Sequence, residues 1–131
     1  MNSLVLGNMG GSFVILVVED HRDVRELVRM MLEVEGYRIV EAENGLQGVE
    51  AARRHEPDAI LMDMSMPILD GCESTKRIRE QPRLATVPII ANTAYNRWEW
   101  RSKAILAGCT DFLPKPFESR KLLAMLSRYL S

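Results

Sequence analysis

The chain has 131 residues, 47% of them hydrophobic, and a formal net charge of −1. This length and composition predict one globular domain with a substantial core and exclude a disordered chain. The near-zero charge gives no general attraction to nucleic acid or a membrane surface, and no apolar run reaches the ~20 residues of a membrane span. The two cysteines, Cys72 and Cys109, fit neither a disulfide framework nor a zinc-ligand spacing, and they suit a reducing, cytoplasmic setting.

Strand and helix patterns alternate along the chain after residues 1–12, which read as a flexible leader ahead of a domain at 13–131. The predicted strands are Phe13–Glu19, Tyr37–Ala42, Asp58–Asp63, Val87–Asn92 and Asp111–Leu113. The predicted helices are His21–Glu35, the segment from the N-cap Asn44 to about His55, Gly71–Glu80, Asn96–Ala107 and Glu118–Leu130. Five β-α units in succession predict a parallel sheet with helices on both faces.

The spacing of apolar residues within the helices also predicts which side chains face the core. These are Val24, Leu27, Val28, Met31, Leu32, Leu46, Val49, Ala52, Ile78, Leu122, Leu123, Leu126 and Leu130. Gly36 and Gly108 are expected to end two of the helices.

Polar side chains stand at the ends of four predicted strands. Glu19 and Asp20 end the first strand, Asp63 closes the third, Thr93 follows the fourth, and Lys115 follows the fifth. Carboxyl ends of parallel strands meet at one edge, where α/β proteins bind ligands, so we expect these side chains to converge. Three neighbouring carboxylates raise one another's pKa unless a cation is present, and an all-oxygen set suits Mg²⁺.

A hydroxyl and an ammonium beside metal-binding carboxylates favour phosphoryl transfer, in which positioning and neutralisation of charge do most of the work. In this interpretation Asp63 is the nucleophile and forms an aspartyl phosphate, and Thr93 and Lys115 bind the phosphoryl oxygens. A backbone carbonyl just after Asp63, at Met64 or Ser65, would complete the metal site.

Taken together, the motifs resemble the receiver domain of response regulators, the phosphoacceptor module of two-component signalling. They are Glu19-Asp20, Asp63, Met66-Pro67 with Asp70-Gly71, Thr93-Ala94, Ala107-Gly108 leading to Phe112, and Lys115-Pro116-Phe117. The resemblance covers roughly residues 13–131. It implies a single-domain (βα)5 flavodoxin-like fold, a doubly wound parallel α/β sheet with strand order 2-1-3-4-5.

The resemblance also implies the metal ligands. Asp20 and Asp63 would bind Mg²⁺ directly, together with the carbonyl of Ser65, and Glu19 would act mainly through a metal-bound water. Ser65 and Tyr95 would line the approach of water to the phosphoryl group.

A second set of implied roles concerns switching. Lys115 would pair with the phosphoryl oxygens, and its peptide bond to Pro116 would be cis. Thr93 would move toward the phosphoryl group, and Phe112 occupies the aromatic switch position. His21 follows the acids directly and could tune them, but we expect it to be an exposed residue in the first turn of its helix.

The implied partner is a sensor histidine kinase or a histidine phosphotransfer domain, which supplies the phosphoryl group. The chain would then be a signalling switch and not an enzyme, catalysing only its own phosphorylation and slow autodephosphorylation.

Residues 95–131 carry 7 basic and 3 acidic residues, a net charge of +4, whereas residues 1–94 carry 10 basic and 15 acidic residues. Trp98 and Trp100, two residues apart, cannot share a helix face. The region 95–131 is therefore a candidate surface for a homodimer or an output partner, although packing of the tryptophans over arginine stems explains the pattern equally well.

Two other functions remain possible at this stage. The first is a receiver fold that docks or dimerises without phosphorylation, a reading opposed by the complete set of acids, Thr93 and Lys115. The second is a Mg²⁺-dependent phosphatase on a similar fold. Phosphatases of the haloacid-dehalogenase type need Asp-x-Asp after the first strand, and Glu19-Asp20-His21 does not match that pattern.

Overall fold

The computed structural model of the chain describes residues 12–66, 68–94 and 98–130. Residues 1–11 of the expected leader, Pro67, Tyr95 and the side chain of Trp98 lie outside the described part, so the predictions made for them stay predictions. None of the helices in the described ranges is long and apolar enough to cross a membrane.

Strands and helices alternate through the described residues, as the sequence predicts. The strands are β1 (Val14–Val18), β2 (Arg38–Ala42), β3 (Ala59–Asp63), β4 (Ile89–Thr93) and β5 (Asp111–Pro114). The α-helices are α2 (Arg22–Val34), α3 (Gly45–His55), α4 (Gly71–Arg79), α5 (Trp98–Ala107) and α6 (Ser119–Leu130), and a short 3-10 helix, η1 (Pro82–Leu84), precedes β4.

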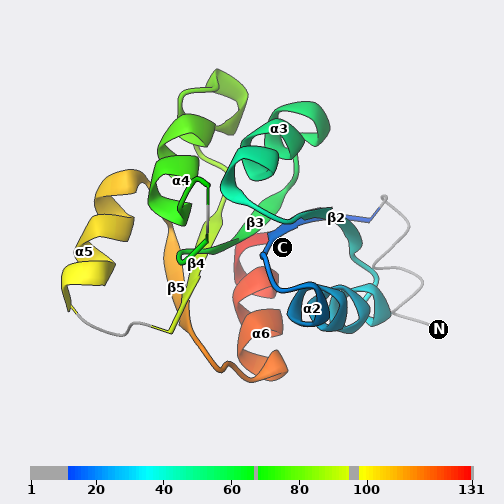
Figure 1. Cartoon of the computed structure of the whole chain (residues 1–131). Coiled ribbons are helices and arrows are strands. Elements are labelled where there is room, and N and C mark those ends of the chain that lie inside the picture. Colours follow the sequence, from blue (N-terminus) through cyan, green and yellow to red (C-terminus); the bar gives the residue numbers. More distant parts are fainter. Residues whose placement is uncertain (1–11, 67, 95–97, 131) are drawn as a thin grey trace.

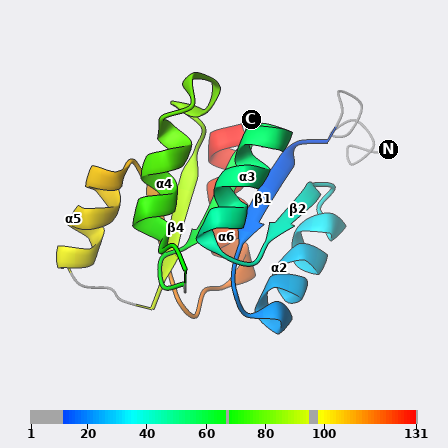
Figure 2. The same ribbon diagram turned by 45° about the horizontal axis from the view of Figure 1, so that its top comes forward.

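The five strands form one parallel sheet in the order β2-β1-β3-β4-β5. Helices α3, α4 and α5 cover one face, and α2 and α6 cover the other (Figures 1 and 2). The predicted flavodoxin-like fold and its strand order are therefore confirmed. Because every pair of strands is parallel, all the carboxyl ends lie at the same edge of the sheet.

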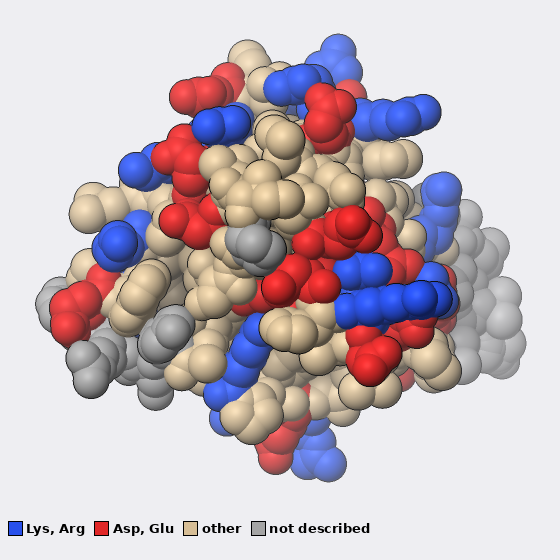
Figure 3. All heavy atoms as spheres, in the orientation of Figure 1, with Lys and Arg blue, Asp and Glu red and all other residues tan. Residues whose placement is uncertain are grey.

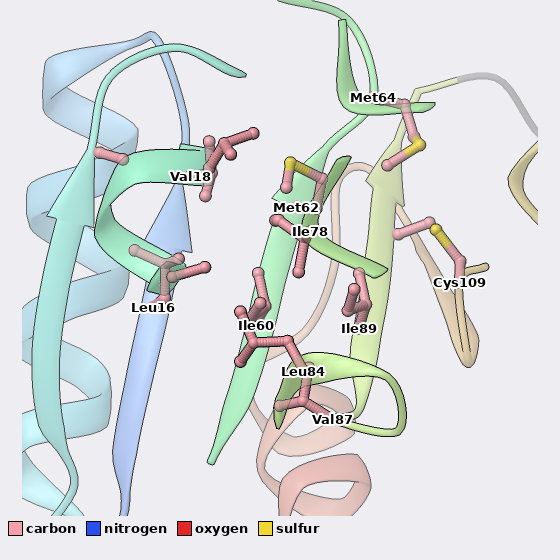
Figure 4. Packing of buried hydrophobic residues seen from close by; sticks show 14 of the residues in the cluster. Leu16, Val18, Ile60, Met62, Met64, Ile78, Leu84, Val87, Ile89 and Cys109 are labelled. Carbon is pink, nitrogen blue, oxygen red and sulfur yellow. The ribbon is translucent and has the colours of Figure 1, made fainter. Parts of the chain in front are cut away.

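The core consists of two layers of side chains, one on each face of the sheet. Leu16 and Val18 of β1 belong to the layer under α3, α4 and α5, together with Ile60 and Met62 of β3 (Figure 4). The residues between them point to the other face, where they pack with α2 and α6. Burial on both faces explains why the strands read as continuous apolar runs in the sequence.

Two predicted core positions on α2 and one on α3 are wrong. Leu46 is 50% exposed, because Gly48 is the residue with which this part of α3 approaches the sheet, while Gly45 packs against the backbone of Leu69. A Cβ atom at Gly48 would lie 3.1 Å from the methyl carbons of Val18, which shows how closely this helix approaches β1. Val24 and Leu27 of α2 are also exposed, because they border an open groove of about 670 Å³ between α2 and the loop after β5.

Helix α5 is attached to the domain through small side chains. Among the described side chains of α5, the buried ones are Ala104 and Ala107, whereas Ile105 and Leu106 are exposed. The helix ends at Ala107 and is followed, as predicted, by Gly108, where φ is +115°.

Candidate functional site

The carboxyl edge of the sheet brings two predicted acids into the protein interior. Glu19 directly follows β1, and Asp63 is the last residue of the neighbouring strand β3. Glu19 is 3% exposed and Asp63 is 1% exposed. Acidic side chains gather near the middle of the face drawn in Figure 3, around the start of α2. The fold therefore places these two carboxylates side by side, as the strand-end argument predicted.

Asp20 and His21 complete a compact group with the two buried acids. Glu19, Asp20, His21 and Asp63 each offer one ligand atom, and these four atoms lie within 4.8 Å of one another. Nδ1 of His21 lies 3.1 Å from Oε2 of Glu19, which also accepts a hydrogen bond from the His21 backbone N–H. His21 is exposed, as predicted, and it also contacts the acids, as the alternative interpretation of this residue required.

Lys115 reaches the same group from the loop after β5. Its Nζ lies 3.2 Å from Oε1 of Glu19 and 3.3 Å from Oδ1 of Asp63. The Lys115-Pro116 peptide bond is cis, as the resemblance implied, and the backbone N–H of Lys115 donates to the carbonyl of Thr93. The ammonium is thus held between two strand ends and points at the predicted acceptor.

The two buried carboxylates have pKa values shifted in opposite directions. Burial raises the pKa of Asp63 to about 6, and the charge of Glu19 adds to this, against the hydrogen bond from the Ser65 N–H and the attraction of Lys115. Burial also acts to raise the pKa of Glu19, but hydrogen bonds from His21 and Lys115 hold that pKa below its usual value. Asp63 is therefore the carboxylate whose negative charge is least compensated.

Two buried carboxylate oxygens, Oδ2 of Asp63 and Oδ1 of Asp20, have no hydrogen-bond partner among the described residues. Oδ1 of Asp20 lies 3.3 Å from Nδ1 of His21, but this contact lacks hydrogen-bond geometry. A buried carboxylate oxygen without a donor costs free energy, which a cation beside both oxygens would remove. These oxygens fit a hard divalent cation such as Mg²⁺, which takes one or two carboxylates and several waters. Ser65 contributes its backbone N–H to Oδ1 of Asp63 at 3.1 Å.

Thr93 and Phe112 lie on the neighbouring strands β4 and β5. Thr93 is the buried last residue of β4, and Phe112 is a partly buried residue of β5. Both line a small cavity together with Met64 and Trp100. The guanidinium of Arg101 in α5 lies 5.4 Å from the centre of the Phe112 ring. A movement of Thr93 would therefore change the space available to Phe112 and the contact of that ring with α5.

Sequence reasoning missed the support behind Glu19. Nη1 of Arg25 donates to the Glu19 carbonyl at 2.9 Å, and its Nε donates to Glu41 of β2 at 2.9 Å. Arg29 binds the other oxygen of Glu41 at 2.6 Å. The acid loop after β1 is thereby tied to the neighbouring strand. No signal in the sequence identifies Glu41 as the partner, because the pairing depends on the register of β1 with β2.

Asp70, which belongs to one of the motifs noted in the sequence, has a structural role. It is the N-cap of α4, and its Oδ1 accepts from the backbone N–H of Glu73 at 2.9 Å. An Asp before a helix with Glu three residues later is a known capping signal, so this role could have been predicted.

Comparison with families of known proteins gives a match over most of the chain. Residues 15–127 match the family described as response regulator receiver domain. The chain is 32% identical over 116 residues to the polar-differentiation response regulator DivK of Brucella anthropi, which covers 88% of this chain and 94% of DivK. It is 40% identical over 115 residues to a 14.6 kDa protein from the sodA1 3′ region of Leptolyngbya boryana, covering 88% of each chain.

Solved structures of similar fold include two with closely matching length. The receiver domain of the sensor histidine kinase PA1611 from Pseudomonas aeruginosa PAO1, with a magnesium ion coordinated in its active site cleft, is 39% identical. It superposes with a TM-score of 0.85 and covers 91% of this chain and 98% of that one. The chemotaxis protein CheY4 of Vibrio cholerae is 30% identical, with a TM-score of 0.88 and coverage of 92% and 100%.

Proposed function

The chain belongs to the response regulator receiver domain family of two-component signalling, and on that basis we propose that Asp63 accepts a phosphoryl group from a phospho-histidine. The donor would be a sensor histidine kinase or a histidine phosphotransfer domain. Phosphorylation would then alter a partner-binding surface. The protein would be a signalling switch in the cytoplasm that acts on itself and turns over no metabolite.

The observation that carries this proposal is the state of the Asp63 carboxylate. One oxygen is bound by Lys115 and by the backbone N–H of Ser65, whereas the other is buried and has no hydrogen-bond partner among the described residues. A carboxylate kept only for stability would have both oxygens satisfied. A buried oxygen without a donor instead leaves this carboxylate available to a cation or an electrophile at the carboxyl edge of the sheet, where α/β folds bind ligands.

In the proposed reaction, an oxygen of Asp63 forms a bond to phosphorus while the bond from phosphorus to the donor histidine nitrogen breaks. The electron pair of that bond remains with the imidazole. Lys115 lies close enough to Asp63 to neutralise charge on the transferred group, and Thr93, at the end of the next strand, offers a hydroxyl. Mg²⁺, held by Asp63 and Asp20 with Glu19 acting through water and Ser65 through its carbonyl, would supply further neutralisation of the phosphoryl oxygens.

The signal would leave the site through Thr93 and Phe112. Withdrawal of Thr93 toward the phosphoryl group would open the small cavity that both residues line, and Phe112 could then pack more deeply. Phe112 contacts Arg101, so the change would reach α5. Residues 95–131, with their net charge of +4, are the proposed surface for a homodimer or an output partner. Lys103 lies 5.0 Å above the Trp100 ring, which supports part of the alternative that the tryptophans pack with basic side chains.

Uptake of a phosphoryl mimic tests the proposal. Wild type should bind beryllofluoride only when Mg²⁺ is present, and Asp63→Asn should not bind it; ¹⁹F NMR would report both results. Asp23→Asn, which removes the same charge from an exposed position of α2, is the matched control and should bind as wild type does. Uptake by Asp63→Asn would refute the assignment of the acceptor. Absence of uptake by wild type would favour a docking module, and release of phosphate from a small phosphomonoester would favour a phosphatase.

A further inference from the structure

The cluster of Glu19, Asp20 and Asp63, called the acidic pocket below, has a nitrogen donor beside it in addition to the oxygens expected there. Nδ1 of His21 lies 3.1 Å from Oε2 of Glu19 and 3.3 Å from Oδ1 of Asp20. The imidazole is thus in contact with two of the three carboxylates. Together with Asp63, these residues offer three oxygens and one nitrogen within 4.8 Å of one another.

The distances from His21 to the two acids match those between neighbouring ligands of one metal ion. With metal–ligand bonds of about 2.1 Å, adjacent ligand atoms are about 3.0 Å apart in an octahedron and about 3.4 Å apart in a tetrahedron. The two distances, 3.1 and 3.3 Å, fall within this interval. A single ion could therefore contact Nδ1 and the carboxylates after small movements of the side chains.

A second observation indicates that the pocket needs a positive ligand. Oδ2 of Asp63 is buried without a hydrogen-bond partner among the described residues, and the Asp63 side chain is only 1% exposed. Oδ1 of Asp20 is also a buried atom without a hydrogen-bond partner among the described residues, although the side chain as a whole is 24% exposed. The acidic cluster is therefore not a solvated surface group whose charge water neutralises.

The identity of the ligand atoms determines which ions the site prefers. Mg²⁺ prefers oxygen ligands and gains little from imidazole, whereas imidazole suits Zn²⁺, Ni²⁺ and Cu²⁺, whose affinities for mixed nitrogen and oxygen sites exceed that of Mn²⁺. We infer that the acidic pocket also binds a first-row transition-metal ion, with His21 Nδ1 as a ligand beside Asp20, Asp63 and Glu19. This inference rests on the proposed metal pocket and adds to it a second class of cation, one that would compete with Mg²⁺.

His21 can serve as a ligand because its side chain does not cap the helix that it precedes. It is the N-cap residue of α2, but its side chain makes no cap hydrogen bond. The side chain is 69% exposed, so rotation of the ring toward an ion disturbs no packing. Its replacement should for the same reason leave the fold of α2 intact.

The composition of the chain allows a sharp experiment, because it contains only two histidines, His21 and His55. His55 is exposed at the far end of α3 and serves as the matched control. Tag-free wild type, His21→Ala and His55→Ala would be titrated calorimetrically with Zn²⁺ and, separately, with Mg²⁺. His21→Ala should lose about tenfold or more in Zn²⁺ affinity, since even removal of an outer partner of a metal ligand costs about 10- to 100-fold. Its Mg²⁺ affinity should stay close to that of wild type, and His55→Ala should match wild type with both ions.

A spectroscopic measurement tests the metal–nitrogen bond itself. Electron spin echo envelope modulation of protein-bound Cu²⁺ should show coupling to an imidazole nitrogen in wild type and in His55→Ala, and none in His21→Ala. Equal Zn²⁺ affinity in all three proteins, or nitrogen coupling that survives in His21→Ala, would overturn the inference.

A further variant separates this inference from the proposed function. Asp20→Asn should weaken binding of both Mg²⁺ and Zn²⁺. If it does so while His21→Ala has no effect, the pocket binds metal through oxygens alone and only the role of His21 is refuted. If Asp20→Asn changes neither affinity, the metal pocket itself is refuted, and the inference is refuted with it.

Discussion

Replacement of Asp63 by Asn should make the metal-free protein more stable at neutral pH, although it removes the proposed acceptor. The ionised carboxylate is almost completely buried, lies near Glu19 and has one oxygen without a hydrogen-bond partner among the described residues. Asn is nearly isosteric and uncharged. Its oxygen can keep the hydrogen bonds from Lys115 and Ser65, and its NH₂ group replaces the unpartnered oxygen with a donor.

The size of the effect follows from the pKa of Asp63. Burial raises this pKa from 3.8 to about 6, a shift of about two units. Each unit corresponds to about 1.4 kcal/mol, so full ionisation in the folded state costs about 3 kcal/mol. Relaxation of the charged site reduces this figure, and we expect Asp63→Asn to raise the free energy of unfolding by about 1 to 3 kcal/mol at pH 7.5.

The pH dependence gives the prediction its sign. The pKa is higher in the folded state than in the unfolded state, so the folded wild type binds a proton first as pH falls. The cost of the charge is therefore present above pH 6 and is removed as the pH falls toward 4. The advantage of Asp63→Asn over wild type should shrink across the same interval. Urea denaturation followed by circular dichroism, in EDTA at pH 7.5, 6 and 5, measures the difference.

Asp23→Asn serves again as the control, because it removes an exposed carboxylate and should change stability little at any of these pH values. The reasoning fails if Asp63→Asn is no more stable than wild type at pH 7.5 without metal. It fails equally if the difference in stability between them is the same at pH 5 as at pH 7.5. Added Mg²⁺ should stabilise wild type and narrow the gap, because the ion binds only the folded state.

Three further predictions concern the surroundings of the site. Asp20→Asn should weaken Mg²⁺ binding more than Glu19→Gln does, because Glu19 is already held by Lys115; equal losses in a tryptophan fluorescence titration would contradict this. Arg25→Met should lower the free energy of unfolding by about 1 to 3 kcal/mol, because it leaves Glu41 and the Glu19 carbonyl without their shared donor. It should also weaken Mg²⁺ binding; if calorimetry shows unchanged Mg²⁺ affinity, Arg25 has a role in stability alone. Burial raises the pKa of Cys109 to about 11, so its thiol should resist iodoacetamide at pH 8 in the native protein and react after unfolding. Peptide mass spectrometry would measure the labelling, and rapid labelling of the native protein would argue against burial of this thiol.

The sequence predicted the fold well for a physical reason. Strands that are buried on both faces must be apolar throughout, so their ends are marked clearly by the first polar residue, as at Glu19 and Asp63. In a parallel sheet those ends converge whatever the details of packing. The gathering of the predicted site residues therefore followed from the topology alone.

The predictions that were wrong concern helices, and what sequence reasoning missed concerns side-chain contacts. Hydrophobic spacing places Leu46 in the core, but Gly48 lets α3 approach the sheet on a different side of the helix, and Gly45 lets it approach the backbone of Leu69. Such close approach leaves no hydrophobic signal in the sequence. The contacts of Arg25 with Glu41 join separate elements, so they depend on strand register and side-chain rotamers, which cannot be predicted from a single sequence.

The way α5 is attached has a consequence for where the domain opens. Burial of an alanine contributes far less hydrophobic free energy than burial of a leucine, and the described buried side chains of α5 are Ala104 and Ala107, whereas α6 buries three leucines. Local opening of α5 should therefore cost much less than global unfolding. Its amide hydrogens should exchange with deuterated solvent well before those of β1 and β3. Among the described helices, the one that contacts Phe112 should thus be the one that thermal motion releases most readily, and under the proposed switch a small change in free energy at Asp63 would be enough to bias its position.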